Sequence, residues 1–531
     1  MWIELVSPRA SPKHTDDKCR KQKSFSLLLT YPNPQFPMEP GGGGGQIAAA
    51  ISGSAAGVDR LSALPDDLLA QILCPLGTRD AVRTSLVSQR WRRVWSLLPE
   101  LRVPSLPCDP IRFRDALAAH QVRLRFLHVL STGGGAADPK SISIWLPAAA
   151  ARVSGNFALV VNQISPVAEA AEEEGLDGIV DLPCFQDATG IMIRLGHHSL
   201  AVPPPAAGVF ARLVSLRLEC VWFEDPSELE DAIASRCPCL QHLRLCHTLR
   251  MYTLTVSSKT LLKMELEELQ GVWELIVDTP ELRELIVSRC LLDDDPIAVI
   301  TAPRLESLEW KYSAGEIDES VELGEMPHLR SLGKLAFFVY GLHDLSYNRT
   351  TVQFLQRFRA METLKLMLGY LPEINIFQYL MEEMNVLPDL AILHLMVDPN
   401  GHAFGAGAFH VLKMCTGIRK LILELSGSSD LEEPNACGTG CICEQQTNWQ
   451  TEEFLFARLQ EVEIRNFRGS DHEDSVVKRL FESATAMTKL KVTFDVSVTE
   501  SKARELCHMF ESFATTPGVC MDFRYRNHTK V

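Results

Sequence analysis

Three cysteines in one short segment are the first residues in the sequence that could bind a metal ion. Cys437, Cys441 and Cys443 follow the spacing Cys-x3-Cys-x-Cys. A tetrahedral zinc ion takes four ligands, and the segment offers no fourth Cys or His; Cys415 and His410 lie upstream. We therefore expect a surface loop here and no metal site.

A second group of metal-ligating residue types consists of Cys237, Cys239, His242, Cys246 and His247. The leucines between them follow the spacing of a strand, whose alternation sends successive side chains to opposite faces. This group is therefore also expected to hold no zinc. Asp293, Asp294 and Asp295 directly precede Pro296, which is typical of a solvated turn rather than a cation site. No metal and no cofactor is expected.

Motifs of the common enzyme classes are missing from the sequence. It contains no Gly-x-Ser-x-Gly elbow, no phosphate-binding Gly-x-x-x-x-Gly-Lys-Ser/Thr loop and no His-Glu-x-x-His pair. The glycine run at 41–45 lacks the Lys and the helix that a phosphate-binding loop needs, so it is interpreted as a linker. We expect a protein without catalytic residues.

Composition narrows the class of protein further. The chain has 531 residues, of which 46% are hydrophobic and 22% charged, so global disorder is excluded. Its 52 basic and 67 acidic residues give a net charge of −15, which disfavours nucleic-acid binding. No apolar run approaches the ~18 residues of a membrane helix. The 15 cysteines are scattered and odd in number, which is typical of reduced thiols in the cytoplasm or nucleus.

The first 57 residues are expected to be a disordered tail. They contain a small basic cluster around Lys21 and the flexible glycine run, but no clean apolar segment of a signal peptide. Met38 directly precedes the glycine run, so translation could begin at Met1 or at Met38.

The segment 59–100 predicts three short helices. Pro65 suits a helix start, and Asp66 and Asp67 then place negative charge at the positive end of the helix dipole. An apolar stripe follows on one helical face, made by Leu68, Leu69, Ile72, Leu73 and Leu76. A later stripe consists of Trp91, Val94, Trp95 and Leu98. A unit of about forty residues cannot bury this much apolar surface alone, so a partner surface is expected.

This segment resembles the F-box of plant F-box proteins. The resemblance rests on Leu-Pro-Asp-Asp-Leu-Leu-x-x-Ile-Leu-x-x-Leu, then Asp-Ala-Val-Arg-Thr-Ser, then Val-Ser-x-Arg-Trp-Arg-x-x-Trp. It implies binding to the Skp-type adaptor of a cullin-RING ubiquitin ligase. The adaptor-binding residues that it implies are Leu64, Pro65, Leu68, Ile72, Leu73, Val82, Val87 and Trp91.

Beyond residue 150 the sequence repeats the phrase apolar-x-x-apolar-x-apolar. Twelve copies begin at residues 188, 213, 240, 261, 282, 305, 329, 361, 390, 418, 459 and 487, and the copy at 329 has its third member displaced to Leu335. The mean spacing of about 27 residues lies in the range of leucine-rich repeats. The alternating end of the phrase predicts a strand, and one repeat cannot bury its apolar side alone. We therefore expect a curved parallel sheet with helices or loops outside it.

Function is expected on the exposed residues between the repeated apolar ones, such as Arg217, Arg244, Glu284 and Glu306. Their diversity identifies no ligand. The phrases at 213–223 and 237–245 resemble the plant F-box/leucine-rich-repeat family. Residues 455–525 resemble the FBD domain of the same family, through residues such as Phe467, Gly469 and Leu480.

The sequence thus predicts an α/β protein: a small N-terminal three-helix F-box followed by a curved leucine-rich-repeat solenoid with a parallel sheet. The expected parts are a tail at 1–57, the F-box at 59–100, a helical connector at 101–150, repeats at 151–455 and an FBD-like region at 456–531. The resemblance implies a non-catalytic substrate receptor of an SCF-type ubiquitin ligase, with a Skp-type adaptor, a cullin and an unknown target protein as partners. A scaffold without ligase activity and a small-molecule sensor are the alternatives.

Overall fold

The apolar phrases of the sequence form the strands of one long sheet. The computed structural model describes residues 64–74, 90–103, 109–131, 138–161, 178–291, 296–311, 321–343, 345–415, 417–426, 440–446, 448–513, 519–525 and 529–530. The chain divides into two units, Met1–Leu64 and Pro65–Val531. Every element below belongs to the second unit.

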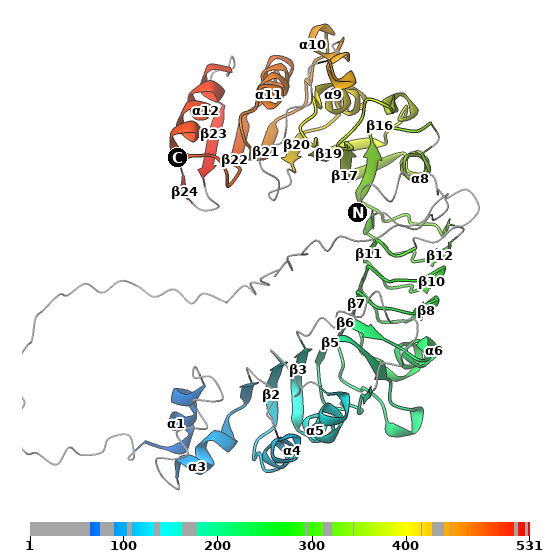
Figure 1. Ribbon diagram of the computed structural model, residues 1–531, viewed down its shortest axis with the longest axis vertical. Helices are drawn as coiled ribbons and strands as arrows, with labels where there is room; N and C mark the ends of the chain where they lie inside the picture. The colour runs from blue at the N-terminus through cyan, green and yellow to red at the C-terminus, as the bar shows by residue number, and fades with distance from the viewer. Residues whose placement is uncertain are drawn as a thin grey trace, which may run out of the picture. The chain divides into compact units, whose positions relative to one another are not determined.

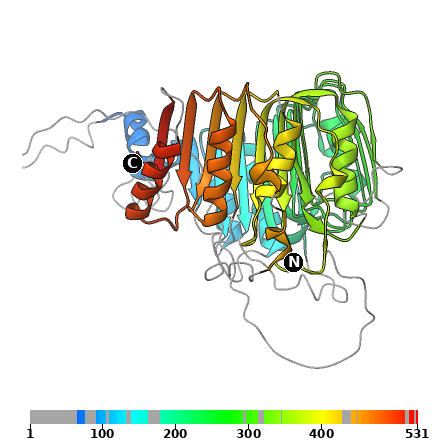
Figure 2. The same ribbon diagram turned by 90° about the horizontal axis from the view of Figure 1, so that it is seen from above.

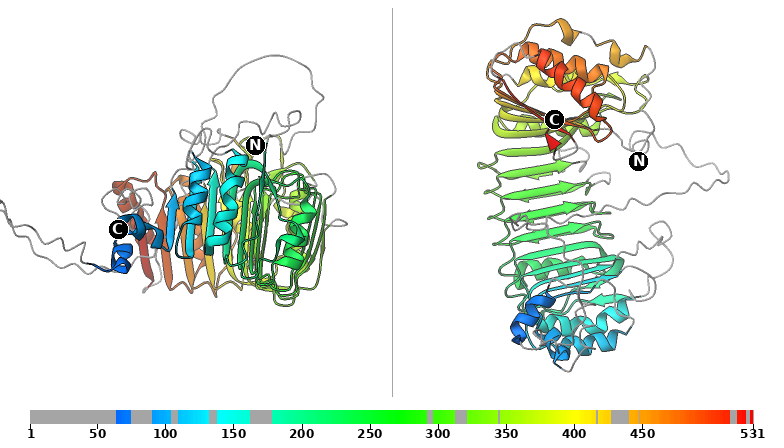
Figure 3. Two further views of the ribbon diagram at one scale, coloured as in Figure 1. Left: turned by 90° about the horizontal axis from the view of Figure 1, so that it is seen from below. Right: turned by 90° about the vertical axis from the view of Figure 1, so that its left-hand side faces the viewer.

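The main sheet has 18 strands, and its neighbouring strands are parallel except at the last pair. The twelve phrases coincide with twelve successive strands: β5 (Gly190–Ala201), β6 (Ser215–Trp222), β7 (His242–Cys246), β9 (Lys263–Glu267), β11 (Glu284–Ser288), β13 (Ser307–Lys311), β15 (Ser331–Phe338), β17 (Ala360–Gly369), β19 (Asp389–Asp398), β20 (Lys420–Leu425), β21 (Glu461–Phe467) and β22 (Lys489–Phe494). Figure 1 shows these strands following one another around a curve, and Figure 3 shows them stacked. The predicted curved parallel sheet is confirmed.

Six further strands lengthen this sheet at its two ends. They are β1 (Glu100–Val103), β2 (Leu124–Ser131), β3 (Val153–Val161), β4 (Ile179–Asp181), β23 (Cys520–Tyr525) and β24 (Thr529–Lys530). The segment 101–150, expected to be a helical connector, therefore contributes β2 and most of β1 to the sheet as well as two helices. Both strands carry the repeat phrase, as Leu98, Leu101, Val103 and Leu124, Leu127, Val129, so the repeats begin before residue 150, where they were expected to start. At the other end, β21, β22 and β23 continue the sheet through the FBD-like region without a break.

The displaced apolar residue of the seventh phrase has a clear structural cause. The register between β15 and β17 shifts between Leu332 and Leu335, which is a β-bulge. Lys334 takes up the extra residue with a φ of 60°. Leu335 thereby returns to the buried side of the sheet, where the phrase requires an apolar residue.

Two kinds of element cover the outer side of the main sheet (Figures 1 and 2). Where phrases lie 21–24 residues apart, there is room only for short strands, which form a second parallel sheet: β8 (Thr253–Ser257), β10 (Glu274–Asp278), β12 (Ile297–Thr301) and β14 (Val321–Leu323). Longer repeats carry helices instead: α6 (Pro226–Asp231), α8 (Ser346–Arg357), α9 (Gly405–Met414), α10 (Asn448–Thr451), α11 (Asp471–Ser483) and α12 (Glu500–Phe513). The number of residues between successive phrases thus determines whether a short strand or a helix covers the outer side.

The remaining elements lie before β3 or in connections. The helices are α1 (Asp66–Leu73), α3 (Trp91–Val94) with a 3-10 turn at Trp95–Leu97, α4 (Pro110–Ala118) and α5 (Pro139–Arg152). Strands β16 (Tyr340–Gly341) and β18 (Gln378–Tyr379) pair antiparallel. Of the three predicted F-box helices, two lie among the described residues. No helix within the described ranges combines the length and apolarity needed to cross a bilayer.

Helix starts follow local capping rules. The Asp109 carboxylate accepts hydrogen bonds from the backbone N–H groups of Ile111 and Arg112 (3.1 and 3.0 Å), and Pro110 occupies the first turn of α4. Ser470 and Glu473 form a reciprocal capping box at the start of α11. These caps fix where α4 and α11 begin.

Candidate functional site

Helix α1 presents two apolar faces that lie next to each other. Leu69 and Leu73, four residues apart, are buried in the chain, whereas Leu68 and Ile72 remain 43% and 44% exposed. Large apolar side chains exposed one turn apart on a short helix are suited to a partner surface. The apolar excess expected from the sequence is therefore present at Leu68 and Ile72.

The other predicted adaptor-binding residues have varied surroundings. Pro65 is exposed, and Leu64 and Trp91 are half-buried. Leu73 is only 1% exposed, so it packs inside the chain and offers no surface for an adaptor. Helical spacing placed Leu73 on the apolar stripe. Spacing alone does not show which residues of a wide stripe are buried by the chain itself and which stay exposed. Val82 and Val87 lie outside the described residues.

An ion pair holds α1 against the start of α3. The Arg90 guanidinium donates a hydrogen bond to Asp66 Oδ1 at 2.7 Å. Asp66 also lies in the first turn of α1, where its negative charge interacts favourably with the helix dipole. The pair fixes the orientation in which Leu68 and Ile72 are presented.

The inner face of the main sheet is lined by the residues between the buried apolar ones. Arg217, Arg244 and Glu265 lie in register on β6, β7 and β9. Arg244 forms ion pairs with Glu265 and, at 3.0 Å, with Glu267. Opposite charges on neighbouring strands thus neutralise one another across the sheet.

The other exposed residues expected to carry function are paired as well. Glu284 binds Lys263 at 3.1 Å, and Glu306 binds Arg283 at 3.4 Å. We refer to the charged residues on the inner face of the main-sheet strands as the charge ladder; its carboxylates include half-buried Glu265 and Glu424 and buried Glu309 and Glu463. A surface of alternating sign suits recognition of a complementary protein rather than of a polyanion.

All four of these carboxylates have lowered pKa values. Burial by itself would raise the pKa of Glu309, but hydrogen bonds from Lys334 and Lys365 outweigh it and lower the pKa. The same balance lowers the pKa of Glu463, through Lys491 and Arg465. The pKa of Glu424 falls mainly because His394 donates a hydrogen bond to it at 2.8 Å.

These lowered pKa values predict a loss of stability in acid. A carboxyl whose pKa is lower in the folded than in the unfolded state stabilises the fold above its unfolded pKa. That contribution disappears as the pH falls through the folded pKa. We therefore expect the urea midpoint of unfolding to fall between about pH 5 and about pH 3. The Glu309→Gln variant should be less stable at neutral pH and show a shallower fall, and an identical pH profile for both proteins would contradict the assignment.

The side chains of Cys237–His247 divide between surroundings only in part. Cys237 lines an apolar cavity beneath α6 and Cys239 is exposed, whereas Cys246 lies near Glu267 on the inner face and also hydrogen-bonds the side chain of His247. Asp293, Asp294 and Asp295 lie outside the described residues.

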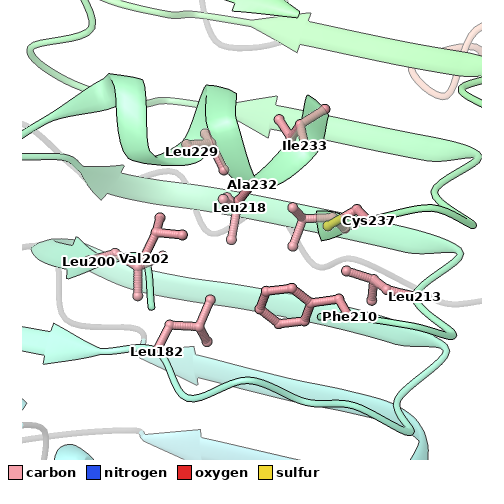
Figure 4. A pocket seen from close by; sticks show the side chains of 11 residues that line it. Leu182, Leu200, Val202, Phe210, Leu213, Leu218, Leu229, Ala232, Ile233 and Cys237 are labelled. Atoms are coloured by element: carbon pink, nitrogen blue, oxygen red, sulfur yellow. The ribbon is translucent and has the colours of Figure 1, made fainter. Parts of the chain in front are cut away.

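A small apolar cavity lies between the main sheet and α6, lined by apolar side chains that include Phe210, Leu229 and Cys237 (Figure 4). Its volume of about 20 Å³ holds roughly one water molecule. Because α6 covers the outer side of the sheet, this cavity does not test the sensor alternative, in which a ligand fills the concave face.

Comparisons with known proteins agree with this arrangement. The F-box domain model matches residues 61–102, within two residues of the predicted 59–100. A model described as "FBD-associated F-box protein At5g56370, LRR repeats" matches residues 182–312. This chain carries an F-box and leucine-rich repeats.

Similar proteins carry some or all of these parts in their names. The F-box/FBD/LRR-repeat protein At5g22660 of Arabidopsis thaliana is 24% identical over 472 residues, covering 84% of this chain and 92% of the relative. The putative FBD-associated F-box protein At5g53635 of the same plant is 22% identical over 457 residues, covering 82% and 95%. The F-box protein At1g60400, also from Arabidopsis thaliana, is 41% identical over 81 residues, covering 15% and 19%.

One side-chain cluster was not found from the sequence. Cys441 and Cys443, expected in a surface loop, are buried against His402. The two upstream residues weighed as further ligands lie elsewhere: His410 hydrogen-bonds the Met384 carbonyl at 2.9 Å, and Cys415 is buried with a pKa raised to about 12 by burial. Cys437 lies outside the described residues. The surface-loop expectation is therefore wrong for Cys441 and Cys443.

Proposed function

We propose that this F-box protein is the substrate-recognition subunit of an SCF-type cullin-RING ubiquitin ligase. The observation that carries the proposal is the presence, in one chain, of an F-box helix with Leu68 and Ile72 exposed and a long repeat sheet with a charged inner face. The F-box supports binding of a Skp-type adaptor, and through the adaptor the chain would join a cullin.

In this proposal the protein acts by proximity. The F-box is held by the adaptor, the repeats hold the target, and the attached machinery transfers ubiquitin. A tethered target meets the ubiquitin-charged enzyme at a raised effective concentration, which accelerates transfer without any reacting group on this chain. The protein itself would be non-catalytic.

The charge ladder is the surface that we assign to the target. Its charges are paired within the sheet, so a target must offer a complementary pattern of both signs to replace or extend these pairs. Half-buried Ile286 and Ile422 lie among the charges on the same face and provide apolar contact. The occupant is therefore a protein surface of mixed charge. We propose the cytoplasm, the nucleus or both as its location, since 15 scattered cysteines suit a reducing compartment.

Affinity capture of the full chain from plant cells, with and without proteasome inhibition, tests the proposal. We expect adaptor and cullin to be captured in both conditions, and ubiquitylated proteins to accumulate with the chain only under inhibition. Capture of the adaptor without cullin or ubiquitin would identify an interaction scaffold instead. Absence of the adaptor would overturn the proposal.

A further inference from the structure

Three side chains with metal-binding donor atoms meet in the interior of the C-terminal half. The donor atoms of His402, Cys441 and Cys443 all lie within 4.8 Å of one another. The three residues are 5%, 2% and 3% exposed. They come from segments 39 residues apart, so their meeting is a product of the fold and not of a short sequence motif.

The connections that follow neighbouring parallel strands create this meeting. His402 follows β19, in a turn where Asn400 and Gly401 have left-handed φ values of 45° and 81°. The Asn400 side-chain amide donates a hydrogen bond to the Tyr370 carbonyl, directly after β17, at 2.6 Å. The two cysteines follow β20, the next strand of the sheet (Figure 1). Connections at the same edge of a parallel sheet converge there.

A backbone carbonyl fixes the tautomer of His402. Its Nε2 lies 3.1 Å from the Pro372 carbonyl oxygen, which can only accept, so Nε2 carries the proton. Nδ1 is then left with a lone pair, and it lies 3.5 Å from Cys441 Sγ. Metal-binding histidines commonly donate their second N–H to a carbonyl in this way.

The cysteine segment is held against the sheet by its own contacts. The Ile442 backbone N–H donates to Asn375 Oδ1 at 3.3 Å. Cys441 caps a 3-10 turn at Ile442–Glu444, and Gly440 before it has a φ of 91°, which favours glycine. This turn brings Cys441 and Cys443 to the same side as His402.

An aromatic ring packs against the histidine of the cluster. The Tyr370 ring stacks on His402 with 6.4 Å between centroids, and Tyr340 packs on Tyr370 at 5.9 Å. Two thiols alone could serve as small apolar packing groups. Together with an imidazole whose lone pair is oriented toward one of them, they make a donor set that suits a soft divalent ion.

We propose that His402, Cys441 and Cys443 bind a zinc ion that fastens the segment between β20 and β21 to the sheet edge. With Zn–S near 2.3 Å and Zn–N near 2.0 Å, tetrahedral geometry places N and S about 3.5 Å apart. The His402–Cys441 distance of 3.5 Å agrees with this value. Closing the 4.8 Å span requires only a small movement of the side chains.

Water can supply the fourth ligand from an adjoining hollow. Cys443 borders a hollow of about 110 Å³, whose lining includes Glu444, His472 and Ser475. This volume is large enough for several waters. On binding, both thiols lose their protons to solvent and the two thiolates neutralise the charge of the ion.

Metal analysis of the purified full chain, produced with added zinc and dialysed, tests the proposal. We expect about one zinc ion per chain in the wild type. The Cys441→Ser with Cys443→Ser variant, and separately His402→Gln, should lose most of it. The matched control is Cys239→Ser, which removes an exposed cysteine outside the cluster and should retain full zinc content.

Cobalt substitution of the wild type keeps the test independent of variant folding. Cobalt held by two thiolates gives a sulfur-to-metal charge-transfer band, and this band should appear with one equivalent of cobalt and disappear when zinc is added. A wild type without zinc and without this band would overturn the proposal. An equal loss of zinc in Cys239→Ser would overturn it as well.

Discussion

Replacing Leu68 and Ile72 together by alanine should weaken adaptor binding by roughly 30- to 150-fold. Somewhat less than half of each side chain is exposed. Full burial of such a side chain is worth ~1.5–3 kcal/mol, so the exposed parts account for about 1 kcal/mol each. The gaps left in the interface add to this loss, giving about 2–3 kcal/mol in total at ~1.4 kcal/mol per tenfold change in Kd. Calorimetric titration of the purified chain with a Skp-type adaptor measures the change.

A matched control separates the F-box surface from exposed apolar surface in general. Ile376 and Leu455 are 81% and 66% exposed and lie far from the F-box in the sequence. Their double alanine variant removes the same kinds of side chain and should bind the adaptor with unchanged Kd. If both double variants weaken binding equally, the assignment of the adaptor surface to α1 is wrong.

The same Leu68/Ile72 variant should separate adaptor binding from target binding. The pairing of the repeat strands does not involve residues 68 and 72. In the proposed function the variant therefore holds its target without delivering ubiquitin, and it should act as a dominant trap when expressed beside the wild type. Joint loss of adaptor and target binding, accompanied by a lower melting temperature, would mean that the two changes had disturbed folding.

The strands of this protein were predictable because their signal is local. Each phrase carries its own alternation, and all twelve phrases became successive paired strands. Even the displacement of Leu335 was visible before the β-bulge that causes it. The strands β1 and β2 carry the same phrase, but they lie before residue 150, where the repeats were expected to begin.

The sites were less predictable, because they depend on contacts distant in the sequence. The helical period of α1 gave one wide apolar stripe, and only the fold shows that Leu69 and Leu73 face inward while Leu68 and Ile72 face outward. His402 has no spacing relation to Cys441, since a 39-residue separation carries no pattern. Only the fold shows that the connections after β19 and β20 converge, and this places His402 next to Cys441.

Replacing Leu285 by alanine should reduce the free energy of unfolding by ~2–5 kcal/mol, through lost burial and the cavity left behind. Leu285 is fully buried and pairs in register with Met264 and Leu308 of the neighbouring repeats, which are also fully buried. In a solenoid each repeat is held only by its neighbours, so a cavity here weakens two interfaces at once.

Ile286 is the matched control, because it lies next in the same strand, half-buried on the opposite face. Ile286→Ala should reduce the free energy of unfolding by less than ~1 kcal/mol. Urea unfolding followed by circular dichroism gives both values, and equal costs for the two variants would contradict the assignment of Leu285 to the repeat core.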